Sequence, residues 1–512
     1  MSVLSRGLEP DLSDLVTEVL DRWPSAGLAV AVVRDGRLAW FRGDGVANAS
    51  SRRPVTQDTV FRVGSVTKTF TAVAVLQLWE RGLVDLDAPA NDYLCSVRLT
   101  PKDGRYQPAT VRHLLTHTAG IGYWLRLPDL LRPRVGSGVR AGRSVPSVTE
   151  LYRRGLPVEV EPGSKWVYSN HGFAVLGQLV EDVSGVPLDH YLRQHVFGPL
   201  GMEHTDLGRS ARVRPYLATG YVLRSRGLRP VADRPVPALG AGEVYSTAAD
   251  LTRYVTALLH GGAAGRGRVL EPTTTAAMFR PHFRADPRLP GMGLGFLLGQ
   301  EGDRRTVGHD GIVPGFLSEM LLAPDDGVGV VVLGNTGGLD GRGAPEPLGV
   351  ALVRRLLGLP DEAVRRDVPA HPETWHELCG WYGPDPGPVT NLFTRAFLGA
   401  GAEVTVRDGH LMLKPLTPVP AVRRGMRLHP DDPHDPRVFR VDLAGLGKGT
   451  QRVVFGGGPG TGTPMRLLMD AMALRKRPDV GNPRPWTVGL LAAGGVAVAA
   501  RGVARRAAPR RP

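Results

Sequence analysis

Cysteine is nearly absent from this sequence, which has 512 residues and only two cysteines, Cys95 and Cys379. That number excludes a disulfide scaffold and a multi-cysteine zinc ribbon. Glycine and proline, with 66 and 44 residues, stay below the ~25–30% combined share that indicates disorder. The 42% of hydrophobic and 22% of charged residues are typical of a globular chain, and at ~150 residues per domain the length predicts about two to four domains.

A long hydrophobic run is also missing. Residues 1–10 have no apolar core, so we expect no secretory signal and a cytoplasmic protein. The uncharged stretch Trp486–Ala500 would reach about 22 Å as a helix, against a hydrocarbon core of ~30 Å. We therefore expect no membrane span. Weak contact between residues 486–512 and a membrane surface is one expectation, and a solvated tail is the alternative.

The net charge of +14 is concentrated at the C-terminus, because residues 475–512 contain nine lysines or arginines and one acid, Asp479. A basic tail is weaker evidence for nucleic-acid binding than a basic face on a fold. No nucleic-acid motif accompanies this tail, so we expect no nucleic-acid partner.

The pattern of apolar runs predicts a mixed α/β (α+β) domain over residues 1–358. Runs around Asp35-Gly36 and Asp325-Asp326-Gly327 predict two hairpins, with strands at residues 28–33, 37–41, 316–323 and 328–334. Helical spacing predicts helices at residues 66–81 and 344–358. Because both ends of this domain supply paired strands while its middle is helical, we expect one antiparallel sheet flanked by helices, with a helical subdomain.

Beyond residue 358 the pattern of apolar and turn-forming residues changes. Residues 359–374 contain three prolines and many charges and are predicted to be a linker. Residues 375–470 have short β-like runs between glycine and proline turns, which predicts a small β-rich C-terminal domain. Residues 471–512 are predicted to be a basic tail with a short apolar segment.

Ser65-Val66-Thr67-Lys68 opens the first strong helix, and the i to i+3 spacing places Ser65 and Lys68 on one face. A serine hydroxyl becomes a nucleophile when a neighbour takes its proton, and a lysine in a desolvated site has a pKa low enough to help. The helix N-terminus favours developing negative charge. Such a tetrad also occurs by chance. On this motif alone, a capping serine with a solvated lysine is the better interpretation.

Two further motifs change that balance. Tyr168-Ser169-Asn170 precedes an apolar helix. A tyrosine beside a lysine cation can act as a general base, and Asn170 can orient Lys68 and hold a substrate amide. Later, Gly308-His309-Asp310-Gly311 places a glycine where an acyl group can approach the backbone closely, and a following N–H can stabilise an oxyanion.

In this order and spacing, Ser-x-x-Lys, Tyr-x-Asn and His-x-Gly resemble the motifs of the serine β-lactamase and penicillin-binding-protein superfamily. The most similar branch is that of class C-like hydrolases, which includes esterases, D-peptidases and acyltransferases. Further stretches are similar to family segments, at residues 111–121, 197–202 and 245–251. The resemblance covers residues 10–355 and implies a β-lactamase-like fold for the first domain.

The resemblance also implies a role for each motif residue. Ser65 would be the acylated nucleophile, Lys68 and Tyr168 would form a coupled acid–base pair, and Asn170 would orient them. No cofactor is implied. The expected substrate is a small-molecule or peptide-like acyl compound.

His309 and Gly311 would bind the substrate, and the N–H groups of Ser65 and Ile312 would form the oxyanion hole. His309 stands where β-lactamases and carboxypeptidases usually have lysine. A histidine is largely neutral at pH 7, and Asp310 beside it disfavours an anion. We therefore expect small neutral esters or amides to be preferred over penicillins.

The sequence predicts a serine hydrolase that forms an acyl-enzyme with an ester, amide or peptide-like substrate. An acyltransferase differs only in the acceptor that resolves the acyl group. A low-turnover scaffold or penicillin-sensor-type protein is a third possibility, which the extra C-terminal residues keep open. Intact Ser65, Lys68 and Tyr168 argue against it.

His113 and His117 have the i, i+4 spacing of zinc ligands, but the stretch His-Leu-Leu-Thr-His lacks the glutamate of the zinc motif and a third ligand. We predict no metal site. Histidines packed near the cleft are the better interpretation.

Overall fold

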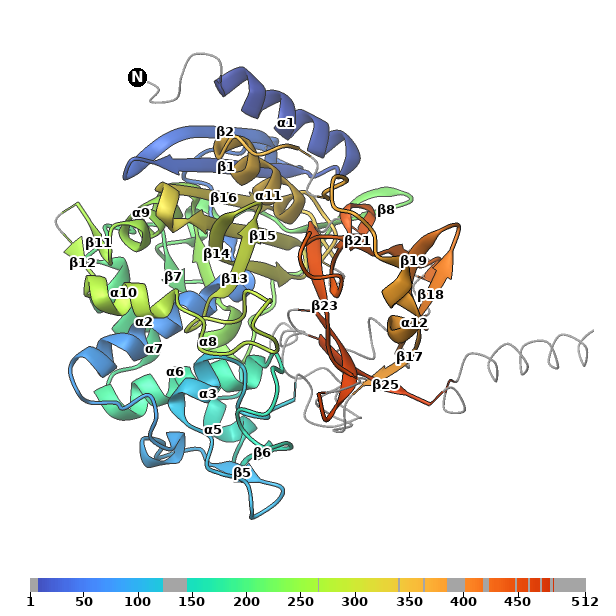
Figure 1. Cartoon of the computed structure of the whole chain (residues 1–512). Coiled ribbons are helices and arrows are strands. Elements are labelled where there is room, and N and C mark those ends of the chain that lie inside the picture. Colours follow the sequence, from blue (N-terminus) through green and yellow to red (C-terminus); the bar gives the residue numbers. More distant parts are fainter. Residues whose placement is uncertain are drawn as a thin grey trace, which may run out of the picture.

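The computed structural model describes most of the chain. The described residues are 8–122, 145–265, 267–338, 341–361, 364–384, 401–417, 423–446, 449–458, 461–469, 472–478 and 482. The predicted membrane-contacting stretch, residues 486–512, lies outside them. Two large antiparallel sheets, each with its own apolar core, organise the described part (Figure 1).

A seven-stranded antiparallel sheet forms the centre of the first part, in the order β13-β14-β15-β16-β1-β2-β3. Its strands are β1 (Gly27–Arg34), β2 (Arg37–Asn48), β3 (Arg53–Pro54), β13 (Leu297–Glu301), β14 (Arg304–Val313), β15 (Phe316–Ala323) and β16 (Val328–Gly334). β1 pairs with both β2 and β16. The two predicted hairpins therefore join into one sheet, and this prediction is confirmed.

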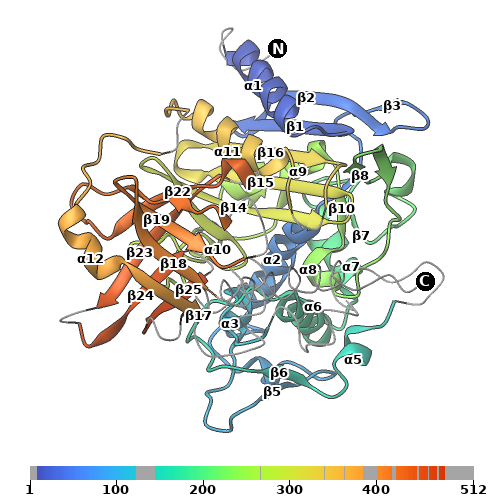
Figure 2. The same cartoon turned by 90° about the vertical axis from the view of Figure 1, so that its right-hand side faces the viewer.

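β1 lies in the middle of the sheet and is buried on both faces, which explains its unbroken apolar sequence. Its alternate side chains enter different cores, with Leu28, Val30 and Val32 on one face and Ala29, Ala31 and Val33 on the other. Helices α1 (Leu8–Arg22) and α11 (Pro345–Leu356) cover the first face. Helices α2 (Thr67–Glu80) and α9 (Ala248–Leu259) lie on the second face (Figures 1 and 2).

α2 is the central helix of the first part, and every residue from Thr67 to Leu78 is buried. A helix that is apolar on all sides must lie inside a protein. A 3-10 turn, η1 (Gly64–Val66), leads directly into α2, so the helix begins beside Ser65, as the sequence predicts. It ends before Gly82, whose φ of 69° lies in the left-handed region that favours glycine.

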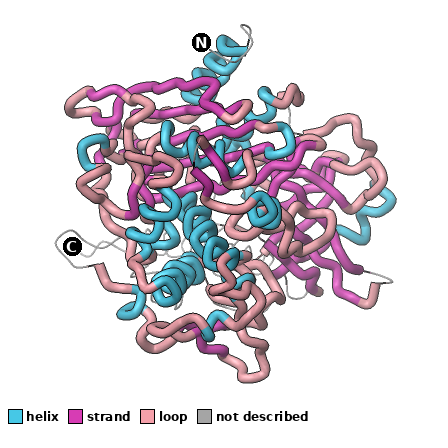
Figure 3. Tube along the Cα trace, turned by 90° about the vertical axis from the view of Figure 1, so that its left-hand side faces the viewer, coloured by secondary structure: helices cyan, strands magenta, loops and turns pink. Residues whose placement is uncertain are grey.

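Several of the remaining helices of the first part pack against α2, and Figure 3 shows helices gathered below the strands of the sheet. The helical elements are η2 (Ala90–Asp92), α3 (Val111–Leu115), α5 (Val148–Leu151), α6 (Asn170–Ser184), α7 (Leu188–Leu192), η3 (Arg193–Phe197), η4 (Arg214–Tyr216), α8 (Leu239–Gly242), α10 (Pro272–Met278) and η5 (Pro324–Asp326). The short strands are β4 (Phe61–Arg62), β5 (Leu99–Pro101), β6 (Leu156–Val158), β7 (Asp206–Leu207), β8 (Tyr221–Arg224), β9 (Gly227–Pro230), β10 (Val244–Ser246), β11 (Ala263–Ala264) and β12 (Gly267–Arg268).

The C-terminal part is a nine-stranded antiparallel sheet in the order β20-β19-β18-β17-β25-β24-β23-β22-β21. Its elements are η6 (Pro372–Thr374), α12 (Trp375–Leu378), β17 (Gly380–Pro384), β18 (Ala402–Arg407), β19 (His410–Pro415), β20 (Met426–Arg427), β21 (His429–Pro430), β22 (Val438–Asp442), η7 (Ala444–Leu446), β23 (Thr450–Gly458), β24 (Thr463–Met469) and β25 (Met472–Arg477). The predicted β-rich character is confirmed. β25 lies past residue 470, where the sequence analysis placed the end of this domain. Its basic residues resemble a tail in the sequence, but Leu474 is buried in the core.

One contact between the two parts is made by residues 286–289 of the first. Arg288 binds Asp286 within its own loop and donates from Nη1 to Asp435 Oδ2 at 2.8 Å. Leu289 packs in a small apolar cluster with Val438 and Val454 of the C-terminal sheet. An ion pair and an apolar contact thus hold the second sheet beside the first.

None of the helices in the described ranges combines the length and the apolar character that a bilayer crossing requires.

Candidate active site

Ser65 lies in η1, where the chain turns into α2, and its side chain is half-buried. No side chain caps this turn, so the Ser65 hydroxyl is not occupied as a helix cap. It accepts a hydrogen bond of 3.0 Å from Lys68 Nζ instead. Its own proton remains available to a second neighbour.

Lys68 is fully buried on the first turn of α2 and uses all three of its donors. Its Nζ donates to Ser65 Oγ, to Asn170 Oδ1 at 2.7 Å and to the carbonyl of Ala241 in α8 at 2.8 Å. Burial lowers the pKa of Lys68 well below its ordinary value, and the negative charge of Asp310 partly opposes that change. A lysine with a lowered pKa gives up a proton more readily, and its neutral amine can then accept and return one.

Tyr168 and Asn170 come from the segment that enters α6. The Ser169 hydroxyl accepts the N–H of Gly172 and caps the helix, which fixes the two flanking residues. The Tyr168 ring centroid lies 4.8 Å from Lys68 Nζ. Ser65 Oγ and the Tyr168 ring are therefore both neighbours of the same ammonium group, and the four predicted catalytic residues lie together.

β14 places His309, Gly311 and Ile312 opposite η1. In the β14–β15 ladder Gly311 pairs with Ser318, whereas β13 reaches only to Gly308 on the other edge. Because hydrogen-bonding directions alternate along an antiparallel strand, the N–H of Ile312 points to the edge that β13 leaves open. That edge faces η1.

Close backbone contact between η1 and β14 requires glycine on both sides. A Cβ on Gly64, whose φ is 52°, would lie 2.8 Å from the Ile312 nitrogen. A Cβ on Gly311 would overlap the Val63 carbonyl and Ser318 Oγ, which are joined by a hydrogen bond of 2.8 Å. The N–H groups of Ser65 and Ile312 thus belong to two segments in direct contact, which is consistent with the predicted oxyanion hole.

His309 is neutral in this site. Its Nδ1–H donates to the Asp310 carbonyl at 2.7 Å, which leaves Nε2 without a proton. Nε2 is buried and has no hydrogen-bond partner among the described residues. Burial lowers the pKa of His309 to about 4, although the Asp310 carboxylate acts in the opposite direction. Position 309, where β-lactamases and carboxypeptidases usually have a lysine cation, therefore carries no charge at neutral pH.

Two parts of the site were not foreseen. The Ala241 carbonyl is a backbone group and leaves no signal in the sequence. His117 was assigned only to packing near the cleft, yet its ring lies 4.4 Å from that of Tyr168. His113, by contrast, accepts the N–H of Thr110 in a capping box at the start of α3. Within the described residues no group of three potential metal ligands occurs.

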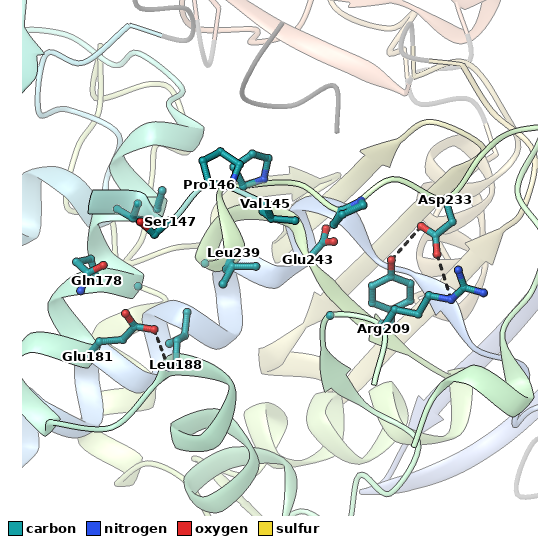
Figure 4. A pocket seen from close by; sticks show the side chains of 18 residues that line it. Val145, Pro146, Ser147, Gln178, Glu181, Leu188, Arg209, Asp233, Leu239 and Glu243 are labelled. Atoms are coloured by element: carbon teal, nitrogen blue, oxygen red, sulfur yellow. Dashed lines mark hydrogen bonds and ion pairs between the residues drawn. The ribbon is translucent and has the colours of Figure 1, made fainter. Parts of the chain in front are cut away.

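A separate cavity of about 450 Å³ lies between α6, α8 and the loop that carries Asp233 (Figure 4). None of the predicted site residues lines it. The two carboxylates at one end have cationic partners, since Arg62 binds both Glu243 and Asp233. The candidate catalytic residues therefore lie in the cluster around Ser65 and not in this cavity.

The fold and the cluster around Ser65 define a serine hydrolase with a Ser-x-x-Lys motif. The sequence pattern described as Beta-lactamase matches residues 12–355, and the chain belongs to that family. It is 32% identical to Esterase EstB of Burkholderia gladioli over 297 residues, which cover 53% of this chain and 74% of the esterase.

Two solved structures are similar over longer stretches. The octameric penicillin-binding protein homologue from Pyrococcus abyssi has a TM-score of 0.60 and 23% identity, and the match covers 91% of this chain and all of the homologue. EstCE1, described as a hydrolase with promiscuous acyltransferase activity, has a TM-score of 0.55 and 24% identity over 65% of this chain and 94% of its own. These likenesses support the fold, including the C-terminal sheet in the first case.

Proposed function

We propose that this serine hydrolase is a carboxylesterase that acts on small neutral esters through an acyl-enzyme on Ser65. The observation that carries the proposal is the set of hydrogen bonds from Lys68, which joins the Ser65 hydroxyl to Asn170 within reach of the Tyr168 ring. The similarity to an esterase over half of the chain supports the substrate class.

Acylation follows from this arrangement. Ser65 Oγ attacks the ester carbonyl carbon while its proton passes to the coupled pair of Tyr168 and Lys68. The carbonyl oxygen becomes an oxyanion, which the N–H groups of Ser65 and Ile312 stabilise. The bond to the alcohol breaks as the pair returns the proton to the alcohol oxygen. Water then attacks the acyl carbon and gives a proton to the pair, the bond from that carbon to Ser65 Oγ breaks, and the carboxylic acid leaves as Ser65 regains a proton.

The neutral state of His309 favours an uncharged substrate. A fixed cation at this position would bind a substrate carboxylate through a charge-assisted hydrogen bond. His309 is 1% exposed and is held without a charge, so it contributes little attraction for the carboxylate of a penicillin. The Asp310 carboxylate, which lies 3.8 Å from His309 Nδ1, repels an anion further.

Ser65→Ala tests the proposal. Wild-type protein should react with a fluorophosphonate probe at Ser65, located by peptide mass, and should cleave a short-chain aryl ester. Ser65→Ala should lose both activities with an unchanged Tm, because the hydroxyl caps no helix. The matched control is Ser147→Ala, since Ser147 does cap α5. That variant should lose about 1 kcal/mol of stability and keep its activity.

Failure of the wild-type protein to form an adduct at Ser65 would contradict the proposed function. Addition of an alcohol or amine acceptor distinguishes hydrolysis from acyl transfer. Transfer of the acyl group to that acceptor in preference to water would make the protein an acyltransferase with the same catalytic residues.

A further inference from the structure

His117 occupies an unusual backbone position directly behind the catalytic segment. Its φ of 58° lies in the left-handed region, which is uncommon for residues other than glycine. Its N–H donates to the Leu114 carbonyl at the end of α3. Such a conformation costs about 1–3 kcal/mol and persists where the surroundings require it.

The reason for this conformation lies in the hydrogen bonds that His117 makes with the segment before α6. Its carbonyl accepts the N–H of Val167 at 2.8 Å. Its ring nitrogen Nδ1 accepts the N–H of Ser169 at 3.1 Å. These two bonds hold the backbone on either side of Tyr168, so one residue determines where that side chain emerges.

The ring of His117 also packs against the ring of Tyr168. The two ring centroids are 4.4 Å apart with an angle of 34° between the planes. Phe173 at 5.0 Å and Trp166 at 5.6 Å enclose the His117 ring from other directions. The ring is 2% exposed and Lys68 is fully buried, so water reaches neither side chain.

The hydrogen bond from the Ser169 N–H also determines which ring nitrogen of His117 carries the proton. Because Nδ1 is an acceptor, the proton of the neutral ring resides on Nε2. Burial holds the pKa of His117 well below its ordinary value, and the nearby positive charge of Lys68 lowers it further. Asp310 is the acid that acts on Lys68 and His309. His117 thus adds bulk and hydrogen bonds to the site without a second cation beside Lys68.

We propose that His117 is a positioning residue for the acid–base pair, which holds Tyr168 in reach of Ser65 and Lys68 and keeps water away from Lys68. The proposal rests on the proposed function of the same site. It does not make His117 a proton carrier, since Nδ1 is occupied by the Ser169 N–H and Nε2 has no partner among the described residues.

Two variants separate the contributions of His117. His117→Gly removes the whole side chain in a residue that adopts a positive φ without strain. His117→Asn also tolerates that φ and keeps an acceptor near the position of Nδ1, but lacks the ring. The rate of fluorophosphonate labelling at Ser65 and kcat/KM for an aryl ester should fall about 100-fold in the glycine variant, the effect of a displacement of about 1 Å. The asparagine variant should recover part of that loss.

The pH profile supplies a readout that a merely structural role would not change. Water that enters the space left by the ring in His117→Gly should hydrate Lys68 and raise its pKa. If neutral Lys68 is the active form, the acid limb of kcat/KM should move to higher pH. Added imidazole should fill the space and restore part of the rate.

His171→Asn is the matched control. His171 is 3% exposed and its Nδ1 shares a hydrogen bond of 2.6 Å with the Tyr152 hydroxyl. This variant should lower Tm and leave the pH profile in place. If the His117 variants lower Tm but keep the wild-type labelling rate and acid limb, His117 is only structural and the inference is overturned. If wild-type protein itself forms no adduct at Ser65, the proposed function fails instead.

Discussion

Lys68, His117 and His309 are three basic side chains that are buried in one small volume. Each has a lowered pKa with burial as the largest cause. Asp310, about one-third exposed, is the carboxylate that opposes the shift in Lys68 and His309. Burial favours the neutral form of both histidines, and each uses Nδ1 in a hydrogen bond to the backbone. Of the three, Lys68 is the one whose nitrogen bonds to the Ser65 hydroxyl.

At the residue scale, part of the site can be predicted from the sequence. The spacing within a motif shows which side chains are neighbours on a helix, and the order of the motifs along the chain matches that of the family. Ser65 and Lys68 are on one face of a helix and could be paired from the sequence. Asn170 could be assigned to orient Lys68 from the donors and the acceptor of its amide, and the resemblance implies the same role. The contact of His117 with Tyr168 depends on a loop with a positive φ, and no periodic pattern encodes such a loop.

His309→Lys tests charge recognition at a single residue. The new ammonium should bind a substrate carboxylate, so kcat/KM for anionic acyl donors should rise at least about 10-fold, the effect of one charge-assisted hydrogen bond of about 1.5 kcal/mol. Neutral esters should gain little. Because Asp310 could pair with the new lysine, His309→Lys combined with Asp310→Gly is the stricter variant. Steady-state kinetics with matched neutral and anionic esters measure the effect.

Two outcomes would contradict this account of position 309. One is wild-type protein that already cleaves a penicillin faster than a short-chain aryl ester. The other is an equal change for both substrate classes in the lysine variants, since position 309 would then not distinguish charge.

At the element scale, the site is the place where three short segments meet the first turn of α2. These segments are η1, the N-terminal end of α6 and the edge of β14 that β13 leaves open. The strands and α2 could be predicted from their apolar patterns. α8 could not be, because its four residues, Leu-Gly-Ala-Gly, contain two glycines and are too short for a period, yet it supplies the third acceptor for Lys68.

Gly311→Ala tests the contact between η1 and β14. The added methyl group would overlap backbone and side-chain atoms of Val63 and Ser318, and the backbone cannot yield locally. We expect a loss of about 1–3 kcal/mol in stability, as for an overpacked core. Labelling of Ser65 should slow strongly, since the Ile312 N–H moves away from η1. Gly104→Ala is the control, because a Cβ there meets nothing within 4 Å. A Gly311→Ala protein with wild-type Tm and labelling rate would disprove the role of this contact.

At the scale of the whole molecule, the C-terminal sheet contacts a segment of the first part that continues to α2. Residues 286–289 hold the sheet, and the same segment continues to Gly295, whose backbone lies against Ala72 of α2. Arg452 of the C-terminal sheet also donates to Gln300 of β13 at 3.2 Å. The composition change after residue 358 predicts a second domain, but its contacts with the first come from isolated arginines and a small apolar cluster, which have no periodic pattern.

Arg288→Glu should weaken the contact between the two sheets. Arg288 bonds to Asp286, to Asp435 and to the Phe455 carbonyl, so the reversed charge faces two carboxylates. Both Arg288 and Asp435 are 30% exposed, and solvent screening limits the loss to about 1–2 kcal/mol. Calorimetry should resolve a separate, earlier transition for the C-terminal sheet, and proteolysis between residues 359 and 374 should accelerate. Arg305→Glu is the control, because Arg305 pairs with Asp325 within the first part and its loss should leave that cleavage rate unchanged. If Arg288→Glu and Arg305→Glu unfold in the same single transition and are cleaved equally fast, Arg288 does not hold the two sheets together.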